Sequence, residues 1–170
     1  MKKIILLSVL TFSLLSCETF VEVDKIGGEW LRECSRLGKG YMIGDQKDSD
    51  LVKKFLDAYE NMDAQLMVDL SADTVKFHPA DIGGVFDVDM TNTDFIVERQ
   101  SNWDSISRDY IFILPINLED SDGRIVTTAF SETRYIKDGS TETNIFYERL
   151  SINEQDQIDR VVQYSRPPTE

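Results

Sequence analysis

The sequence predicts an α+β domain in which two helices come first and an antiparallel sheet follows. Apolar residues over positions 51–70 recur at the spacing of an α-helix, whereas those over positions 110–118 alternate at the spacing of a β-strand. Short turn sequences separate the later segments, which favours an antiparallel meander. Helices followed by strands indicate that the helices cover one face of a single sheet. The chain of 170 residues has the length of one ordinary domain, and 41 % hydrophobic residues is typical of a globular protein.

The beginning of the chain has the organisation of a secretory signal. A basic start at Lys2 is followed by an apolar run over residues 4–15, and the small residue Ser16 then precedes Cys17. The sequence Leu-Leu-Ser-Cys at residues 14–17 resembles the lipobox of bacterial lipoproteins. This resemblance implies that residues 1–16 are a signal peptide and that Cys17 carries acyl chains such as palmitate. The alternative is a plain secretory peptide in which the cysteine is accidental.

Lipidation predicts a location in the bacterial cell envelope, at the outer membrane on its periplasmic or surface side. Two or three acyl chains give durable anchoring, whereas one chain alone binds a membrane only marginally. Loss of the two lysines within residues 1–16 takes the formal net charge from −13 to −15. So acidic a chain argues against binding to nucleic acid, and against attachment to anionic headgroups through a basic patch. We therefore expect the lipid itself to make the membrane contact.

Residues 17–47 are predicted to be the lipidated cysteine and a tether, with a short segment over residues 29–37 that packs on the domain. The tether contains five of the nine glycines, but it also contains large apolar residues such as Trp30, which pure linkers lack. With Cys17 acylated, Cys34 is the only remaining thiol, so no internal disulfide can form. We expect Cys34 to be a small buried hydrophobic residue rather than a reactive thiol.

The domain is predicted to begin with a helix that starts at residues 48–50 and ends near Asn61. Polar and acidic residues at 48–50 suit a helix start. The apolar residues that follow share one helical face: Leu51, Val52, Phe55, Leu56 and Tyr59. A second, shorter helix repeats the pattern over residues 62–70, and residues 74–77 are predicted to be a short strand.

The rest of the chain is predicted to be one more helix and four strands. The helix is expected over residues 91–106, after a break at Pro79 and two glycines. Strands are expected over residues 110–118, 124–137, 143–152 and 158–164, with turns between them. The prolines at 167 and 168 end the last strand, and residues 167–170 form a tail.

The order of these elements and the sequence of residues 51–80 resemble the NTF2-like superfamily, which includes SnoaL-like proteins and ketosteroid isomerase. The shared features are an amphipathic helix with an aromatic residue near its end, the acidic Asp63 opening a second helix, and an Ala72-Asp73 pair before a strand. The resemblance spans roughly residues 48–166. It implies a cone in which N-terminal helices pack on a curved antiparallel sheet, with a ligand pocket at the open end.

The comparison with ketosteroid isomerase argues against that enzyme's reaction. The position of its oxyanion-donating tyrosine falls on Phe55, and the position of its general-base aspartate falls on Pro79. Neither side chain can donate or accept a proton. His78 and Asp81 flank the second position, and they are the candidates for acid–base chemistry if the protein is an enzyme. The alternative for His78 is a partly exposed or hydrogen-bonded histidine without a catalytic role.

A pocket for a small, partly apolar ligand is expected to be lined by aromatic residues that combine an apolar body with a polar tip, together with their neighbours. The candidates are Phe55, Tyr59, His78, Trp103, Tyr147 and Tyr164. No phosphate-binding glycine loop and no nucleophile elbow occurs in the sequence, and no cofactor is expected.

One stretch has the oxygen spacing of an EF-hand calcium loop. Asp87, Asp89, Thr91 and Glu98 fall at positions one, three, five and twelve of such a loop. No helix is predicted before this stretch, and an acidic loop ahead of a helix has the same composition. We therefore expect no metal site, with calcium at these residues as the alternative.

Three functions remain open at this point. The first is non-catalytic binding of a small apolar or amphipathic ligand, or of a protein partner, by a lipid-anchored domain. The second is a SnoaL-like enzyme that uses His78 in acid–base chemistry. The third is a structural module that forms a homodimer through its sheet.

Overall fold

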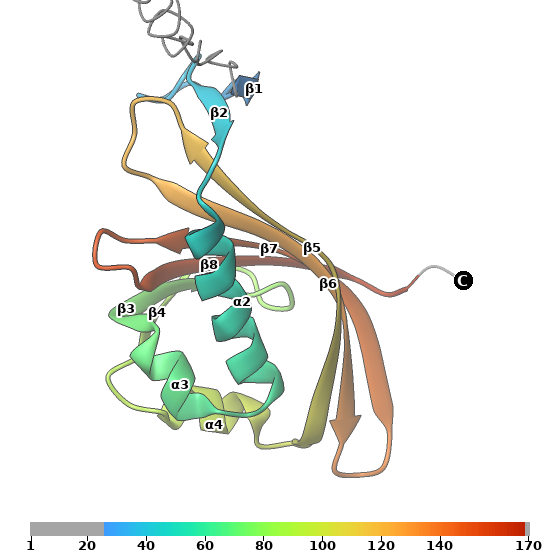
Figure 1. Ribbon diagram of the computed structural model, residues 1–170. Helices are drawn as coiled ribbons and strands as arrows, with labels where there is room; N and C mark the ends of the chain where they lie inside the picture. Colours follow the sequence, from blue (N-terminus) through green and yellow to red (C-terminus); the bar gives the residue numbers. More distant parts are fainter. Residues whose placement is uncertain (1–25, 169–170) are drawn as a thin grey trace, which may run out of the picture.

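A computed structural model describes residues 26–168 and shows a curved sheet wrapped around three helices (Figure 1). The predicted signal peptide, Cys17 and the end of the tail lie outside the described residues. The elements in chain order are β1 (Ile26–Glu29), β2 (Gly40–Ile43), α2 (Gln46–Glu60), α3 (Ala64–Asp69), β3 (Ser71–His78), β4 (Phe86–Asp89), α4 (Asp94–Gln100), β5 (Trp103–Leu118), β6 (Arg124–Ile136), β7 (Thr141–Ile152) and β8 (Ile158–Arg166). Among these residues no helix is long and apolar enough to cross a membrane.

The sheet confirms the predicted α+β fold and the predicted meander. Within the described chain its order is β1-β2-β5-β6-β7-β8-β3-β4, and β5 to β8 pair consecutively in antiparallel fashion. The last strand of the meander, β8, pairs in parallel with β3. This parallel pair brings the early helix–strand segment back against the end of the chain, and the sheet encloses the helices on its concave face (Figure 1).

The two predicted N-terminal helices are present and are positioned by the residues that predicted them. Helix α2 buries Val52, Phe55 and Leu56, which belong to one face and pack into the core of the sheet. Asp63 caps α3, because its Oδ1 accepts a hydrogen bond from the backbone N–H of Leu66 at 3.0 Å. The prediction that Asp63 opens α3 is therefore confirmed. The predicted start of the first helix at residues 48–50 is wrong, because α2 begins at Gln46 and Asp48 lies within its first turn.

A buried ion pair fixes the start of α2 against the sheet. Asp48, in the first turn of α2, is 1 % exposed and bonds to the guanidinium of Arg124 at the start of β6. Arg124 Nη1 also donates to Asp156 Oδ1, 2.5 Å away in the turn between β7 and β8. One guanidinium thus joins a helix, a strand and a turn at one end of the cone.

The predicted helix over residues 91–106 is wrong in its second half. Helix α4 ends at Gln100, and Trp103 already begins β5 by pairing with Ile136. The regular alternation of faces predicted for residues 110–118 is wrong as well. A bulge between Tyr110 and Phe112 interrupts it. The extra residue turns Tyr110 toward the core and leaves Phe112 exposed on the other face. Strand β4 was not predicted.

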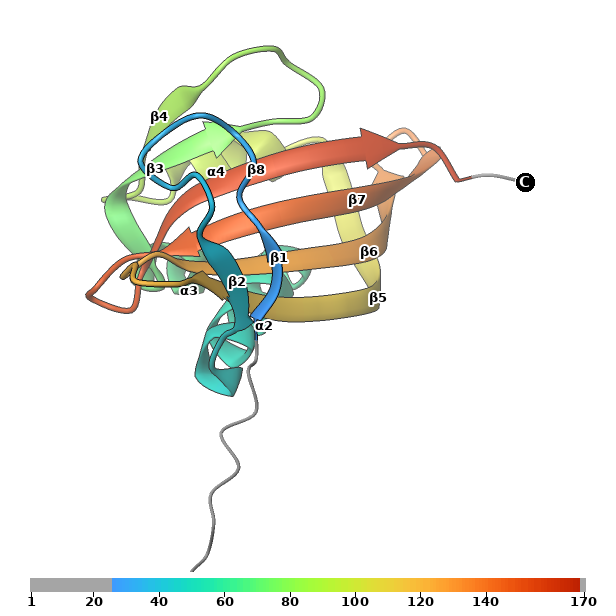
Figure 2. The same ribbon diagram turned by 90° about the horizontal axis from the view of Figure 1, so that it is seen from above.

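The segment predicted as a tether joins the sheet. Strands β1 and β2 form a hairpin, and β2 pairs with the end of β5, with Tyr41 opposite Leu118. The loop over residues 30–39 crosses the face of the sheet that is turned away from the helices, here called the outer face (Figure 2). The folded domain therefore starts before the predicted residue 48. Cys34 lies on this loop and is exposed, so the prediction that it is buried is wrong.

Candidate functional site

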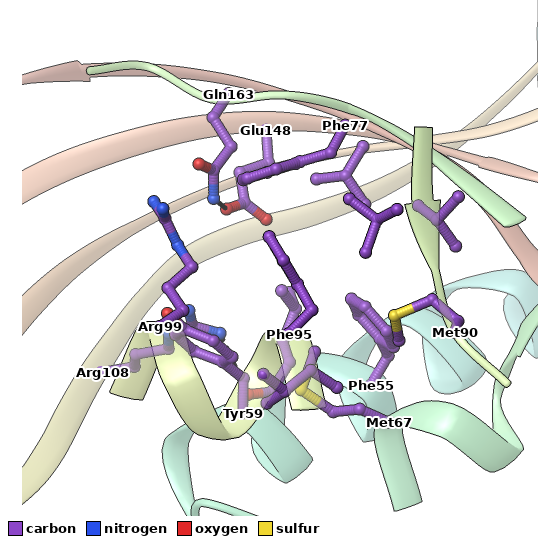
Figure 3. Close-up of a pocket in the computed structure, with 15 residues that line it drawn as sticks. Phe55, Tyr59, Met67, Phe77, Met90, Phe95, Arg99, Arg108, Glu148 and Gln163 are labelled. Atoms are coloured by element: carbon purple, nitrogen blue, oxygen red, sulfur yellow. Dashed lines mark hydrogen bonds between the residues drawn. The ribbon is translucent and has the colours of Figure 1, made fainter. Parts of the chain in front are cut away.

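A cavity of about 70 Å³ lies between the helices and the concave face of the sheet (Figure 3). One end is apolar and includes Phe55, Met67 and Met90. The other end carries polar groups from α2, α4 and the central strands: Tyr59, Arg99, Arg108, Glu148 and Gln163. The cavity is therefore amphipathic, although the sheet and helices that form it bury mostly apolar side chains.

The polar end is held by a buried ion pair between Arg108 on β5 and Glu132 on β6. Their side chains are 3 % and 1 % exposed, and Arg108 Nε donates to Glu132 Oε2 at 2.7 Å. Arg108 Nη1 donates to the carbonyl of Leu56 at 3.0 Å. Arg134 Nε donates to the other Glu132 oxygen at 2.7 Å. Each charge is paired and hydrogen-bonded, which is the condition for keeping charges out of water.

Two aromatic rings enclose the Arg108 guanidinium. Its carbon lies 4.8 Å from the ring centre of Tyr59 and 4.5 Å from that of Phe130. Burial raises the pKa of Tyr59 to about 12, so its hydroxyl stays protonated and can donate a hydrogen bond. The Tyr59 hydroxyl is thus a neutral group at the polar end.

Glu148 and Gln163 line the polar end on the side of the sheet (Figure 3). They are opposite each other on β7 and β8, and Gln163 Nε2 donates to Glu148 Oε1 at 2.6 Å. Burial raises the pKa of Glu148, against the opposing effects of Arg108 and of the bond from Gln163. Gln163 Oε1 is buried and has no hydrogen-bond donor among the described residues. This oxygen is an acceptor that a bound molecule could satisfy.

The cavity is separated from a larger surface groove by three side chains. The rings of Phe77 and Phe95 meet edge to face at 6.0 Å, and the guanidinium carbon of Arg99 lies 5.3 Å from the centre of the Phe77 ring. Beyond them lies a groove of about 530 Å³, whose lining includes Pro79, Ile82, Phe86, Asn92, Asp94 and Glu98. All three side chains line both spaces, so we call them the gate.

The structure brings two of the six predicted pocket residues to the cavity. Phe55 and Tyr59 line it. Trp103 lies one layer away, with its ring 6.2 Å from that of Tyr59 and 4.4 Å from the Arg134 guanidinium. Trp103 therefore supports the polar end without lining the cavity.

Tyr147 and Tyr164 do not line the cavity, which corrects the prediction for both residues. They are cross-strand partners on β7 and β8 and stand 42 % and 67 % exposed. Their neighbours Glu148 and Gln163 face the cavity, and side chains alternate between the faces of a strand. The two tyrosines therefore belong to the outer face.

The candidate acid–base pair is not assembled. Phe77 faces the cavity, so the next residue, His78, is directed to the outer face, where its Nε2 is buried without a partner among the described residues. Asp81 pairs with Arg99, with a separation of 3.7 Å between Oδ1 and Nη2. His78 is also absent from the cavity lining and the groove.

The residues with calcium-loop spacing have other partners. Asp87 pairs with Lys76 on β3 at 2.8 Å. Asp89 accepts hydrogen bonds from the backbone N–H and hydroxyl of Thr91, and these bonds lower its pKa. Glu98 lines the groove, as do Asp87 and Asp89. Within residues 26–168 no group of three or more His, Cys, Asp or Glu side chains could hold a metal ion.

The sequence reasoning missed the charged residues of the polar end. Glu132 lies two residues after the buried Phe130 on β6, and Glu148 lies two residues after the buried Phe146 on β7. Residues two positions apart on a strand share a face, so a charged residue two positions from a buried residue points toward the core. That phase relation was present in the sequence and could have identified both carboxylates.

No protein-family model matches the sequence, and no curated protein sequence is similar to it. Solved structures do share its fold. A protein described as a putative ketosteroid isomerase from Kribbella flavida has a TM-score of 0.56 and 12 % identity over 75 % of this chain and 84 % of its own. An epoxide hydrolase from M. tuberculosis, described as LEH-like, has a TM-score of 0.56 and 12 % identity over 71 % and 84 %.

A third similar structure is a putative SnoaL-like polyketide cyclase from Shewanella denitrificans. Its TM-score is 0.55, with 6 % identity over 72 % of this chain and 92 % of its own. Identities this low establish the fold alone. The chain therefore has an NTF2-like fold, as its element order predicts.

The burial of Glu148 predicts a pH-dependent stability. Because its pKa is raised above the ordinary value of 4.5, the folded protein retains a proton that the unfolded chain has already lost. The free energy of unfolding should therefore decrease as pH rises above this value. The variant E148Q has no such proton, so its stability relative to the wild type should increase with pH. Thermal unfolding followed by circular dichroism across this range measures the difference.

The control for this prediction is E142Q, which removes an exposed carboxylate from the same strand. A difference between E148Q and the wild type that stays constant with pH would contradict the prediction. A trend of equal size in E142Q would contradict it as well.

Proposed function

We propose that this protein binds a small amphipathic molecule in its NTF2-like cavity, without transforming it, while lipid on Cys17 holds it at a membrane. The observation that carries the proposal is a cavity with an apolar end and, at its polar end, an unsatisfied acceptor. Gln163 Oε1 is buried at the polar end and lacks a donor within the described chain. A buried acceptor without a partner costs about 1–3 kcal/mol, which a ligand hydroxyl or amine would recover.

The size of the cavity limits what can enter it. A volume of about 70 Å³ accommodates only a short apolar group. The rest of a longer ligand would pass the gate and lie in the groove of about 530 Å³. The cavity and the groove have four lining residues in common, which are the three gate residues and Val88. Rotation of a gate side chain would therefore join the two spaces. The ligand class is therefore an apolar group that carries a hydrogen-bond donor.

The polar groups of the site support binding rather than catalysis. Arg108 and Glu132 are bonded to each other, Arg108 is also bonded to α2, and Glu132 also accepts from Arg134, so neither is free to act on a ligand. Phe55 and Pro79, the two positions matched to catalytic residues, lack ionisable groups. His78 faces the opposite side of the sheet from the cavity.

One observation favours acid–base catalysis as a second candidate function. Glu148 is a buried carboxylate with a raised pKa that lines the cavity, and such groups serve as general acids or bases in enzymes. The similar structures include proteins described as an isomerase, an epoxide hydrolase and a polyketide cyclase. If the protein is an enzyme, Glu148 takes the place that the sequence suggested for His78.

The binding proposal predicts selectivity for ligands with a donor. Linear 1-alkanols should stabilise the full chain, purified in neutral detergent, against thermal unfolding. Methyl ethers of the same length should bind about fivefold to tenfold more weakly, because they leave Gln163 Oε1 without a donor. The variant Q163L should bind both series equally, and titration calorimetry measures the affinities.

The matched control is Q155L, which changes an exposed glutamine in the turn between β7 and β8 and should keep the preference. Failure of every alkanol to stabilise the wild-type chain would contradict the proposal. Native mass spectrometry of the same preparation identifies any retained molecule. Chemical conversion of that molecule by the wild type, and its loss in E148Q, would establish catalysis instead.

The lipid anchor predicts the behaviour of cysteine variants. C17S should release the protein from the membrane fraction into the soluble fraction, because acyl chains would no longer be attached. The control is C34S, since Cys34 is exposed on the loop over residues 30–39 and carries the same chemistry. C34S should remain with the membrane. Retention of C17S in the membrane fraction would refute the anchor.

The outer face favours the predicted homodimer as a structural role. Four residues form a row across β5 to β8, in which Phe112 pairs with Ala129, Ala129 with Tyr147, and Tyr147 with Tyr164. The three aromatic members are at least 40 % exposed. An exposed apolar row of this kind is typical of an interaction surface.

The dimer predicts that Y164E weakens self-association roughly tenfold or more, since large aromatic residues dominate interface energies. Analytical ultracentrifugation of the full chain in neutral detergent measures the dissociation constant. The control is V97E, which places the same charge at an exposed position on α4. A wild-type chain that stays monomeric at all concentrations would rule out the dimer.

A further inference from the structure

A second hollow, of about 380 Å³, lies on the outer face, with Trp30 and Arg36 of the loop over residues 30–39 in its lining. Figure 2 shows the course of this loop over the sheet. The hollow is separated from the cavity by the thickness of the sheet, because it is formed by the loop and the outward residues of β6, β7 and β8. Its lining is Trp30, Arg36, Leu118, Gly123, Arg124, Ile125, Arg149, Ser151, Ile152, Asp159, Arg160 and Val162. Four arginines thus surround one hollow in a chain whose net charge is −13.

Three of these arginines have no carboxylate partner among the described residues. Arg124 is bonded to Asp48 and Asp156. Within the part of the chain that the structure describes, no carboxylate lies within ion-pair distance of Arg36, Arg149 or Arg160. The lining therefore offers three free guanidinium groups.

The two arginines of the sheet are held close together. In the register of β7 and β8, Arg149 lies opposite Val162 and Arg160 lies opposite Ser151. The two arginines are therefore diagonal neighbours on adjacent strands. Such neighbours have their side chains about 7–8 Å apart or less, within mutual reach for long side chains. Like charges at this distance repel each other, and an anion between them would remove the repulsion.

Trp30 positions the guanidinium groups. The carbon of Arg36 lies 5.6 Å from its ring centre, and the carbon of Arg149 lies 5.7 Å from it. The indole Nε1 is buried and has no acceptor within residues 26–168. The hollow thus holds an unsatisfied N–H donor beside its cations, which also suits an anion.

Asp159 is the one acidic residue in the lining. Its Oδ1 is buried and, like the indole nitrogen, unpartnered within the described chain. A carboxylate oxygen accepts hydrogen bonds and repels another negative oxygen, so it selects an anion that carries an O–H donor. With Asp159 included, the three free arginines leave a net charge of +2 in the hollow.

We propose that this hollow is a binding site for a phosphate group, either free or as a monoester. Arginine forks fit phosphate oxygens in pairs of hydrogen bonds, and the charge of +2 matches a phosphate dianion. A phosphate dianion with one O–H also satisfies Asp159, which a sulfate dianion cannot do. The site rests on different residues from the cavity and does not depend on the function proposed for it.

The test compares inorganic phosphate with sulfate by titration calorimetry on the full chain in neutral detergent. The pH is kept above the second pKa of phosphate, so that both ions are dianions and only phosphate carries an O–H. Phosphate should bind saturably, and sulfate should bind roughly tenfold more weakly. Equal binding of the two ions, or no saturable binding of phosphate, would overturn the proposal.

Variants assign the binding to the hollow. R149Q and R160Q should each weaken phosphate binding roughly tenfold or more, because charge-assisted hydrogen bonds are lost. The control is R166Q, which removes an exposed arginine near the end of β8 outside the hollow and should leave the affinity unchanged. D159N should bind phosphate and sulfate alike. An equal loss in R166Q would show general charge attraction and refute the site.

A final comparison identifies the source of the phosphate group. Glycerol 3-phosphate and a short-chain phosphatidic acid carry the same headgroup chemistry. Equal affinity supports a soluble phosphomonoester, whereas roughly tenfold tighter binding of the lipid supports a headgroup. Circular dichroism of each variant verifies that its fold is unchanged, so a loss of affinity reports on the site.

Discussion

The buried ion pair between Arg108 and Glu132 is the interaction on which the interior of the cone depends. A buried ion pair gains little over well-packed apolar residues, because both charges lose their hydration. Its value here lies in geometry. Arg108 donates to Glu132 on β6 and to the carbonyl of Leu56 on α2, and its own backbone N–H donates to Glu60 at the end of α2. One residue of β5 therefore sets how deeply α2 sits against the sheet, and with it the floor of the cavity.

The two sites differ in charge because they use opposite faces of the same two strands. On β7, Glu148 faces the cavity and Arg149 faces the outer hollow; on β8, Gln163 faces the cavity and Val162 faces the hollow. Inside, Arg108 is already bonded to Glu132, so the cavity suits a neutral amphipathic molecule. Outside, three of the four arginines in the lining have no carboxylate partner within residues 26–168, which suits an anion. The alternation of side chains along a strand thus gives a small sheet two surfaces of different chemistry.

The sequence predicted the elements that local chemistry determines. Asp63 could be identified as a helix cap, and the apolar face of α2 followed from its helical spacing. The long strands β6 to β8 followed from period-two patterns and turn residues. Features that depend on distant contacts could not be predicted in the same way. The bulge after Tyr110 exchanges the faces of β5, and nothing in its alternating sequence signals the extra residue.

The site was harder to predict than the fold for a related reason. Tyr147 and Tyr164 have the composition of pocket residues, but their phase relative to Phe146 and Glu148 places them on the outer face. A prediction from residue type alone therefore chose the wrong residues. The alternation of side chains along β7 would have identified Glu148 as a residue that faces the cavity. The hollow beneath the loop over residues 30–39 could not be inferred at all, since it needs the hairpin to cross three strands that lie about a hundred residues later in the chain.

The position of the hairpin links the proposed anchor to the proposed phosphate site. Ile26, where the described chain begins, is nine residues from Cys17, so the two can be at most about 30 Å apart even when fully extended. Trp30 and Arg36 follow within the next ten residues and line the hollow. If Cys17 carries lipid, the start of the hairpin therefore stays within about 30 Å of the anchored residue, which brings the hollow within reach of the bilayer. Its arginines would then be available to anionic headgroups, and this favours a lipid source for the phosphate.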